Sequence, residues 1–558
     1  MSALRPEAAA RQQWGRMSAN DPMRTVDFRQ PLSDAGQLNI EPALFFMLRP
    51  LLRFWRKTKR VMAMNTRYLA RVFATAGLTL GLLAISATEA EASYAIYVGK
   101  NLTEDGSVLI GGSGDEVSSH WLEIVPARRF PEGTTIRVGV DETANMPGRF
   151  IKIPQAIQTN RYLTMNYSDY EGFPPPITNG GLNEHNVAAR DVWSDSRPEL
   201  VAMTPNPQKG PSYSDLSRIA MERATSAREA VEIIGKLIDK YGYSTYGGNS
   251  HMFADENEGW VLLNFAGGQG LWVAERLGPN DIRVSYPGDI GNIPLDFHGS
   301  PNYMGSKNFI DFAIQQGWFD PDAGEPFNVT SVYGTDDVQY PRDELEQELR
   351  QAAPIDLRRM LNAVRDSRLS KDTTGYGQVA HLRAGVRPEN RMLWVAATGS
   401  VTTPFVPYRI GVQQIPPEFG KHRYLTKGEA TRFVTKDWQI QEATEFAGRT
   451  FKRLMYFTCD HPDKFLFEVT EAITAFEDRL IEDQESVEET SDALFDSGQE
   501  QLALKFLTEH SSNAASSALE LGKALLGSIE ARTEILYGFR APETDDMSLL
   551  DYDMVGCN

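Results

Sequence analysis

Cysteine and recognisable ligand or nucleotide motifs are scarce in this 558-residue sequence. It has no C-x-x-C pair and no H-E-x-x-H motif, and its eight histidines show no other ligand spacing, so we predict neither a metal site nor a cofactor. It also lacks a G-x-S-x-G elbow and a Walker loop, which excludes the common serine-hydrolase and nucleotide-binding classes. The two cysteines, Cys459 and Cys557, allow one disulfide or two free thiols, and the spacing leaves both open.

Basic residues are fewer than acidic residues in this chain. The chain has 56 Lys and Arg against 75 Asp and Glu, a net charge of −19. Residues 1–92 hold 13 of the basic and 7 of the acidic residues, so the remainder carries about −25. This balance argues against a nucleic-acid partner. With 41% hydrophobic and 23% charged residues, the chain is long enough to bury a substantial core.

One apolar run near the start has the order of a secretory signal. Arg67 and Arg71 precede an apolar stretch at 72–85, and Ala90-x-Ala92 offers the small side chains that a signal peptidase accepts. The run is shorter than the roughly 20 residues of a membrane-spanning helix. We therefore predict a signal peptide at 62–92 and an exported protein, periplasmic or secreted, without stable membrane insertion after cleavage.

Residues 1–61 are predicted to lie outside the fold. Basic residues crowd just before Met62 and Met64, either of which is a better start for a normal signal peptide. The interpretation is a non-structural or mis-assigned extension. The alternative is a short membrane-surface helix at 43–55, interrupted by Pro50.

Cleavage after Ala92 would make Ser93 the first residue, with a hydroxyl and a free α-amine on one residue. A predicted strand at 94–99, a turn at Asp105-Gly106-Ser107 and a second apolar run at 108–110 form a hairpin. If Gly99 faces Val108, antiparallel pairing places Ser93 opposite Gly114 and brings Asp115 beside the chain start. There Asp115 can hold the amine, and Gly111, Gly112 and Gly114 leave room for a substrate.

The rest of the chain divides into a mixed core at 93–420 and a mainly helical portion at 421–558. Turn residues between short apolar runs predict further strands at 121–170, 252–254, 260–264, 392–397 and 405–410.

A capping box at Ser226 and apolar residues at helical spacing predict a helical pair over 214–241 that covers a sheet. Residues 289–354 are predicted to be long loops that wall a substrate cleft. Helices are predicted at 443–456, 463–481 and 500–536.

Several ordered motifs carry a resemblance to a known family. They are Ser93-Tyr-Ala-Ile-Tyr-Val98-Gly99-Lys100, Asp105-Gly106-Ser107, Gly112-Ser113-Gly114-Asp115, the stretch 181–188, the stretch 227–231, the stretch 248–255 and Leu393-Trp394-Val395-Ala396. The sequence resembles the dipeptidase and secernin family of N-terminal-nucleophile hydrolases, relatives of bile-salt hydrolases and penicillin V acylases. The resemblance runs from Ser93 to about residue 536. It implies an α+β fold, a four-layer αββα sandwich with a mainly helical C-terminal portion.

The resemblance also implies site residues. Ser93 would be the nucleophile, Asp115 would position its amine, and Asn183 and Asn249 would stabilise the oxyanion. From residue type alone, each asparagine could equally be a turn amide. Two departures stand out: Ser93 takes the place of the family's usual cysteine, and Gly112 that of an arginine which contacts the nucleophile or substrate.

The sequence therefore predicts an exported dipeptidase that forms an acyl-enzyme on Ser93 with its own α-amine as general base. The alternatives are an acylase acting on N-acyl amides or lactams, and a catalytically silent binding protein on the same scaffold. The expected partner is a small peptide or N-acyl amide substrate. The sequence leaves the oligomeric state open, and a homo-oligomer is one of the alternatives.

Overall fold

The computed structural model describes residues 93–114, 120–167, 170, 172–335, 342–370, 374–421, 445–538 and 557. The chain divides into two compact units, Met1–Thr88 and Glu89–Asn558, and all described residues belong to the second. The predicted signal peptide at 62–92, the extension at 1–61 and Asp115 lie outside the described residues. None of the described helices is long and apolar enough to cross a membrane.

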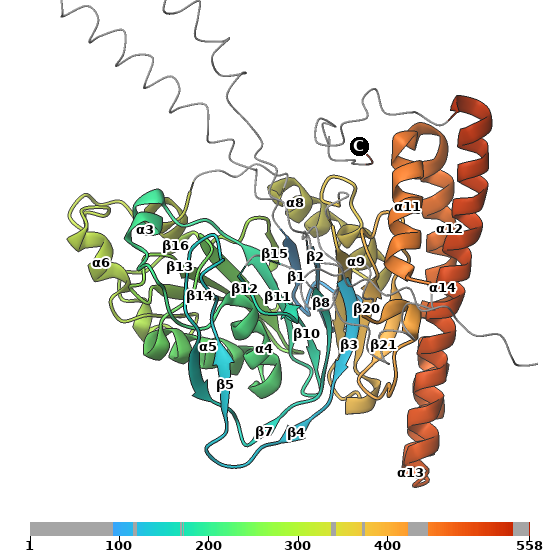
Figure 1. Cartoon of the computed structure of the whole chain (residues 1–558), viewed down its shortest axis with the longest axis horizontal. Helices are drawn as coiled ribbons and strands as arrows, with labels where there is room; N and C mark the ends of the chain where they lie inside the picture. The colour runs from blue at the N-terminus through green and yellow to red at the C-terminus, as the bar shows by residue number, and fades with distance from the viewer. Residues whose placement is uncertain are drawn as a thin grey trace, which may run out of the picture. The chain divides into compact units, whose positions relative to one another are not determined.

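Two antiparallel sheets face each other at the centre of this unit (Figure 1). In the described residues, one sheet has six strands in the order β15-β1-β2-β19-β20-β21. Its strands are β1 (Tyr94–Val98), β2 (Val108–Gly114), β15 (Ile282–Ser285), β19 (Tyr376–Leu382), β20 (Met392–Ala396) and β21 (Val406–Arg409). Strand β1 pairs with β2, which follows it in the chain, and with the distant β15, while β2 also pairs with the distant β19. The sheet therefore forms only when segments far apart in the sequence pair.

The other sheet has nine strands in the described residues, in the order β17-β14-β13-β12-β11-β10-β8-β3, with β9 beside β8. They are β3 (His120–Val125), β8 (Tyr162–Tyr167), β9 (Ile177–Thr178), β10 (Gly180–Asn183), β11 (Ala188–Trp193), β12 (Gly248–Ala254), β13 (Gly259–Phe265), β14 (Trp272–Leu277) and β17 (Tyr303–Gly305). Three short ribbons complete the strands: β4 (Arg128–Arg129) with β7 (Gln158–Thr159), β5 (Thr135–Val138) with β6 (Ile151–Pro154), and β16 (Asn292–Ile293) with β18 (Phe327–Asn328).

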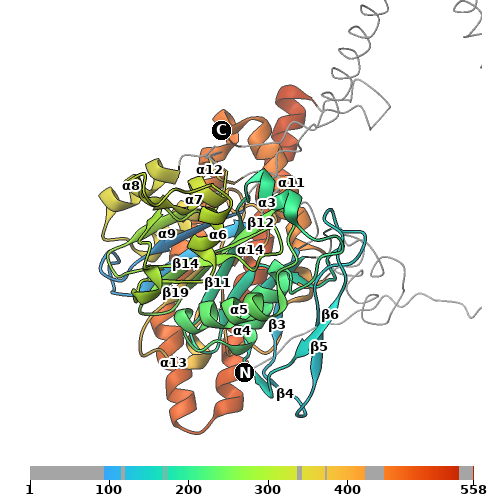
Figure 2. The same cartoon turned by 90° about the vertical axis from the view of Figure 1, so that its left-hand side faces the viewer.

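Helices cover the outer face of each sheet, which gives the four predicted layers. The described helices are α3 (Pro198–Met203), α4 (Tyr213–Arg223), α5 (Ala227–Tyr241), α6 (Phe309–Gln315), α7 (Val329–Tyr333), α8 (Arg342–Ala352), α9 (Leu357–Val364), α11 (Ala447–Asp460), α12 (Pro462–Glu482), α13 (Gln484–Asp496) and α14 (Glu500–Tyr537). Helices α4 and α5 lie side by side on the nine-stranded sheet, and α8 and α9 pack on the six-stranded one (Figures 1 and 2). The αββα architecture with a helical C-terminal portion is confirmed.

Alternation along the strands separates two hydrophobic layers. Phe253, Trp260 and Leu262 belong to a buried cluster with Val231 and Ile234 of α5. Their sequence neighbours on the same strands, such as Met252 and Val261, belong instead to the large cluster that also contains β1. Successive side chains of a strand point to opposite faces. The second set therefore fills the space between the two sheets, and the first set lies under the helices.

The helical pair predicted over 214–241 is confirmed, although its caps differ from the prediction. Ser226 accepts a hydrogen bond from the backbone N–H of Glu229, but the Glu229 carboxylate accepts from Thr225 rather than from the N–H of Ser226. The reciprocal capping box stands instead at the start of α4, between Ser212 and Asp215. Helix α5 ends at Gly242, whose φ of 82° suits glycine.

The region 289–354 is more structured than predicted, because it contains α6, α7, α8 and three short strands. The predicted C-terminal helices are present as α11, α12 and α14, and α13 is an additional helix. The structure joins Cys459 of α11 to Cys557 in a disulfide, which decides between the two alternatives left open by the sequence.

One buried carboxylate ties the C-terminal helices to the sandwich. Glu477 of α12 accepts hydrogen bonds from Arg358 at 2.6 Å, from Arg365 at 2.5 and 3.0 Å, and from the backbone N–H of Phe405 at 2.7 Å. Arg358 lies in the first turn of α9, Arg365 directly follows its last residue, and Phe405 precedes β21. The carboxylate is fully buried, so its desolvation is compensated only while these donors remain in place.

We therefore expect Glu477→Gln to lower the free energy of unfolding by about 3–5 kcal/mol, because two guanidinium groups lose their buried anion. Urea unfolding followed by circular dichroism measures the change. The matched control is Glu509→Gln, which removes an exposed pair with Lys505 and should change stability by less than about 1 kcal/mol. Equal effects of the two substitutions would contradict this account of Glu477.

Candidate active site

Ser93 lies at the start of β1 and is only 7% exposed. The observed register pairs Tyr94 with Ser113 and Val98 with Leu109, which is the register predicted from the hairpin. Continued by one residue, it places Ser93 opposite Gly114. On the other side of β2, Gly114 pairs with Tyr376 of β19. These three residues form one rung across the six-stranded sheet, and we call it the Ser93 rung.

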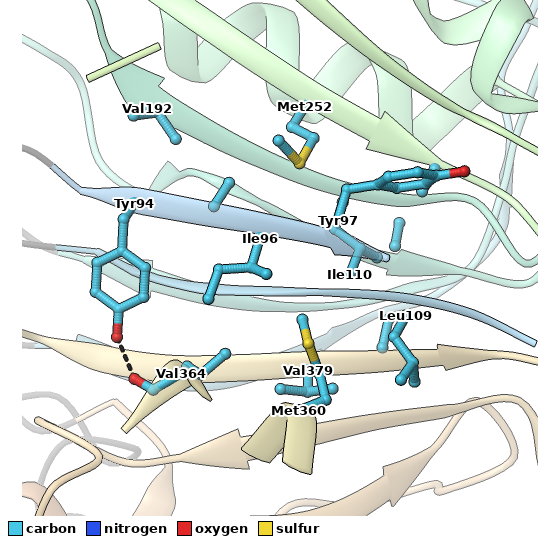
Figure 3. Close-up of a cluster of buried hydrophobic side chains, with 14 of the residues drawn as sticks. Tyr94, Ile96, Tyr97, Leu109, Ile110, Val192, Met252, Met360, Val364 and Val379 are labelled. Carbon is cyan, nitrogen blue, oxygen red and sulfur yellow. Dashed lines mark hydrogen bonds between the residues drawn. The ribbon is translucent and has the colours of Figure 1, made fainter. Parts of the chain in front are cut away.

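The side chains of β1 alternate between the two faces of the sheet (Figure 3). Tyr94 and Ile96 point towards α9, where the Tyr94 hydroxyl donates a hydrogen bond to the carbonyl of Val364. Tyr97 points the other way, towards Met252 of the nine-stranded sheet. Because the alternation has a period of two, Ser93 belongs to the face of Tyr97, between the sheets.

A fully buried cation reaches the Ser93 rung from the opposite sheet. Arg190 of β11 is 0% exposed. Its guanidinium donates hydrogen bonds to the backbone carbonyl of Ser113 and to the hydroxyl of Tyr376. It also lies 5.1 Å from the centre of the Tyr376 ring. Arg190 could not be singled out from the sequence, since nothing local to it shows that its side chain crosses to β2 and β19.

Aromatic rings also pack against Tyr376 of the rung. The imidazole of His120 lies 5.5 Å from the Tyr376 ring and 5.2 Å from the Tyr167 ring. A Cβ on Gly375 would run into this imidazole, so His120 packs directly over the glycine. The rung is therefore enclosed by packed rings and one permanent positive charge.

Asn183 has a local structural role in this structure. Its Nδ2 donates to the carbonyls of Met221 at 3.2 Å and Ala224 at 2.8 Å. Its Oδ1 accepts from the backbone N–H groups of His185 and Val187. Both amide hydrogens thus hold the connection between α4 and α5. Asn183 also lies three residues along β10 from Gly180, the partner of Arg190, a separation of about 10 Å.

Asn249 is equally engaged. Its Oδ1 accepts from the Tyr246 hydroxyl at 2.7 Å, and its Nδ2 donates to the carbonyl of Ser250 at 3.0 Å and lies 3.3 Å from Nε2 of His251. Along β12 it alternates onto the face of Phe253, under α4 and α5. The oxyanion role of Asn183 and Asn249 stays a prediction, and their contacts are those of structural amides.

The glycines after β1 do not leave space for a substrate at two of the three predicted positions. A Cβ on Gly111 would meet Val364 and Val379 at 2.8 Å. At Gly112 the φ of +151° disfavours side chains, and a Cβ would overlap the carbonyl oxygen of Tyr94. Close strand packing therefore requires these glycines, which corrects the prediction. It also means that Gly112 could not be an arginine in this backbone.

His251 is a buried titratable group that the sequence did not single out. Its ring is stacked on Phe253, and Nδ1 lies 3.3 Å from the Ser217 hydroxyl of α4. Burial lowers the pKa of His251 to about 3, because the charged form would lose its hydration. The imidazole is therefore neutral at physiological pH and acts as a packing and hydrogen-bonding group beside Asn249.

Two further observations limit the chemistry of the described residues. They contain no group of three or more His, Cys, Asp and Glu side chains that could hold a metal ion. A cavity of about 570 Å³ lies between α11 and α14, lined by Phe446, Arg449 and Leu526 among others, and no residue of the Ser93 rung lines it. This cavity is not the candidate active site.

Comparison with known proteins supports the resemblance carried by the motifs. Residues 92–342 match the model for Peptidase family C69. The resemblance predicted from the sequence is thereby confirmed over this segment, which begins one residue before Ser93 and covers less than half of the chain. Two residues of the rung, Ser93 and Gly114, lie in this matched segment, and Tyr376 lies beyond it. Arg190, which contacts the rung from the facing sheet, also lies in the segment.

Curated relatives match over a similar stretch. A probable dipeptidase of Latilactobacillus sakei is 27% identical over 256 residues, which cover 44% of this chain and 50% of the relative. A probable dipeptidase B of Lactococcus lactis subsp. lactis is 26% identical over 254 residues, covering 44% and 49%. The chain thus spans about half the length of the curated relatives it matches. A mutant conjugated bile acid hydrolase of Clostridium perfringens aligns with 57% of this chain and 92% of its own, at a TM-score of 0.30 and 13% identity.

We expect His251 to make stability depend on pH. In the unfolded chain a histidine has a pKa of about 6.5, so between pH 6.5 and 3 the unfolded state binds more protons. Stability from this group is therefore complete above pH 6.5 and is lost as pH falls through this window. Between pH 7 and pH 5 the loss from one such group is about 2 kcal/mol.

Urea unfolding of His251→Gln at both pH values should show a smaller difference than the wild type. The matched control is His298→Gln, an exposed histidine, which should keep the wild-type difference. An undiminished pH dependence in His251→Gln would show that this imidazole is not the buried neutral group described above.

Proposed function

We propose that this protein is a dipeptidase of the N-terminal-nucleophile type, with Ser93 as the nucleophile of the mature chain. The observation that carries the proposal is the position of Ser93. It opens β1 in the predicted register, on the face between the two sheets, one residue after the C69 segment begins. The names of the relatives in Latilactobacillus sakei and Lactococcus lactis supply the class of substrate, a dipeptide.

The reaction uses two groups of one residue. The Ser93 hydroxyl attacks the scissile carbonyl while its α-amine, with an ordinary pKa of about 7.7–8.0, takes the hydroxyl proton. The C–N bond then breaks, and the α-ammonium returns this proton to the leaving amine. Water attacks the resulting ester with the same amine as base, which releases the acid and restores the hydroxyl. No histidine is needed, because an amine in this pKa range is partly neutral near pH 7–8.

The oxyanion needs hydrogen-bond donors aimed at the attacked carbonyl. Because the amide hydrogens of Asn183 and Asn249 are engaged elsewhere, we propose backbone N–H groups beside Ser93 as these donors. Asp115 remains the proposed partner of the amine by its place in the sequence, one residue after Gly114.

The mechanism requires removal of the leader, so we also propose export followed by cleavage after Ala92. Protein purified from its native host and analysed by mass spectrometry should begin at Ser93. A mature chain that begins at any other residue would rule out catalysis by the α-amine of Ser93, while leaving the fold unaffected.

With mature wild-type protein, we expect hydrolysis of a dipeptide panel. Ser93→Ala should abolish it, because no hydroxyl remains to form the ester. A variant with one added residue before Ser93 should also be inactive, since its hydroxyl is kept but the amine becomes an amide. Initial rates by ninhydrin or coupled amino-acid detection measure both changes.

Ser285→Ala is the matched control, a buried serine on the neighbouring strand β15 whose removal should leave the rate unchanged. Full activity of Ser93→Ala would refute the proposal. Hydrolysis of N-acyl amides or lactams in place of dipeptides would point to the acylase alternative. Peptide binding without any acylation of Ser93 would point to a silent binding protein.

A further inference from the structure

Beside the Ser93 rung, β2 has one position that excludes a side chain and a neighbouring position whose carbonyl binds a cation. Gly112 lies on β2 opposite Ala95, and its φ of +151° and the nearby Tyr94 carbonyl leave no place for a side chain. Ser113, the next residue, receives a guanidinium through its carbonyl oxygen, and that guanidinium is Arg190. The guanidinium next to Ser113 therefore belongs to a residue of the nine-stranded sheet and not to a residue of β2.

Arg190 makes contacts that fix the ends of two strands at once. One terminal nitrogen donates to the Ser113 carbonyl at the end of β2, and the other donates to the Tyr376 hydroxyl at the start of β19. Ser113 pairs with Tyr94, the residue after Ser93, and Tyr376 pairs with Gly114. Ser113 therefore lies beside the residue that follows Ser93, and Tyr376 lies beside Gly114, one strand further away. Loss of the guanidinium would remove a contact from each of these two positions.

The guanidinium group of arginine is suited to bridging two strands, but burying its charge between the sheets costs free energy. Its planar group offers donors in a fixed geometry and keeps its charge at every accessible pH. A buried cation costs several kcal/mol of desolvation, so its retention calls for compensating contacts. Here those contacts bridge the two sheets next to the proposed nucleophile.

We propose that Arg190 is the positioning residue of Ser93: it clamps β2 and β19 so that the Ser93 hydroxyl and amine keep a productive geometry. This inference rests on the proposed function. Arg190 acts through Ser113 and Tyr376 rather than on the substrate. Its loss should therefore lower kcat and leave KM little changed.

The test compares Arg190→Met and Arg190→Lys with the wild type in dipeptide hydrolysis. Arg190→Met keeps much of the volume but no donor, and we expect kcat to fall about 100-fold, the size of effect that a misplaced reacting group produces. Arg190→Lys keeps the charge and one donor and should recover part of this loss. Tyr376→Phe removes only one acceptor and should lie between Arg190→Met and the wild type.

Arg409 provides a matched control. It is the other fully buried arginine among the large buried side chains, on β21, where it donates to Gln484 of α13. Arg409→Met should destabilise the fold to a similar extent in urea unfolding but leave kcat close to the wild-type value. A drop in kcat that merely follows stability would appear in both variants.

A second measurement does not depend on substrate binding. A small β-lactone should acylate Ser93 in the wild type, detected by intact mass, and Arg190→Met should slow acylation in parallel with kcat. Wild-type kcat and acylation in Arg190→Met, or an equal loss in Arg409→Met, would overturn this inference alone. Absence of both acylation and hydrolysis in the mature wild type would overturn the proposed function, and the inference with it.

Discussion

The antiparallel pairing of β1 with β2 is the constraint on which the candidate site depends. Its register decides that Ser93 faces the interior between the sheets and that Gly114 and Tyr376 share its rung. A slip of one residue would turn Ser93 towards α9 and place Tyr94 between the sheets. The glycine at 112 protects this register, because the β1 backbone approaches so closely there that only a residue without a side chain fits.

Much of this arrangement could be predicted because its determinants are local. The turn at 105–107 lies between two strands whose apolar residues alternate, and these features suffice to set the hairpin register. The same holds for α5, where Ser226 and Gly242 mark the two ends. Other features depend on residues far apart in the chain. Glu229 had two possible partners one residue apart, and only the folded geometry selects Thr225.

The site residues also divide into those whose position follows from local sequence and those whose contacts depend on distant residues. The position of Ser93 before β1 could be inferred from a motif, and its role stays a prediction. The contacts of Asn183 come from a helix connection 38 and 41 residues downstream, which no local pattern reveals. Arg190 is separated by 77 and 186 residues from the groups it binds. A single arginine in a strand has no sequence signal for its direction. The role of Asp115 stays a prediction, because this residue lies outside the described part of the chain.

Buried charged side chains join separate elements at three places in the described part of this fold. Arg190 joins the two sheets, Glu477 joins α12 to α9, and Arg409 joins β21 to α13. Each charged group is held by several donors or acceptors from another element, so each contact fails unless both elements are in place. Such contacts favour one arrangement of the layers over others of similar hydrophobic packing, since a mismatch would leave a charge buried without compensation.

The disulfide between Cys459 and Cys557 closes a loop with a sequence separation of 98 that contains α12, α13 and α14. A covalent link across a loop of this length removes about 4.7 kcal/mol of chain entropy from the unfolded state. Such a link persists in oxidising surroundings and is reduced in a glutathione-rich cytosol. The stability of helices α12, α13 and α14 thus depends on the redox environment. In an oxidising compartment the disulfide closes the loop that contains them, whereas in a reducing compartment packing and buried charge alone hold them in place.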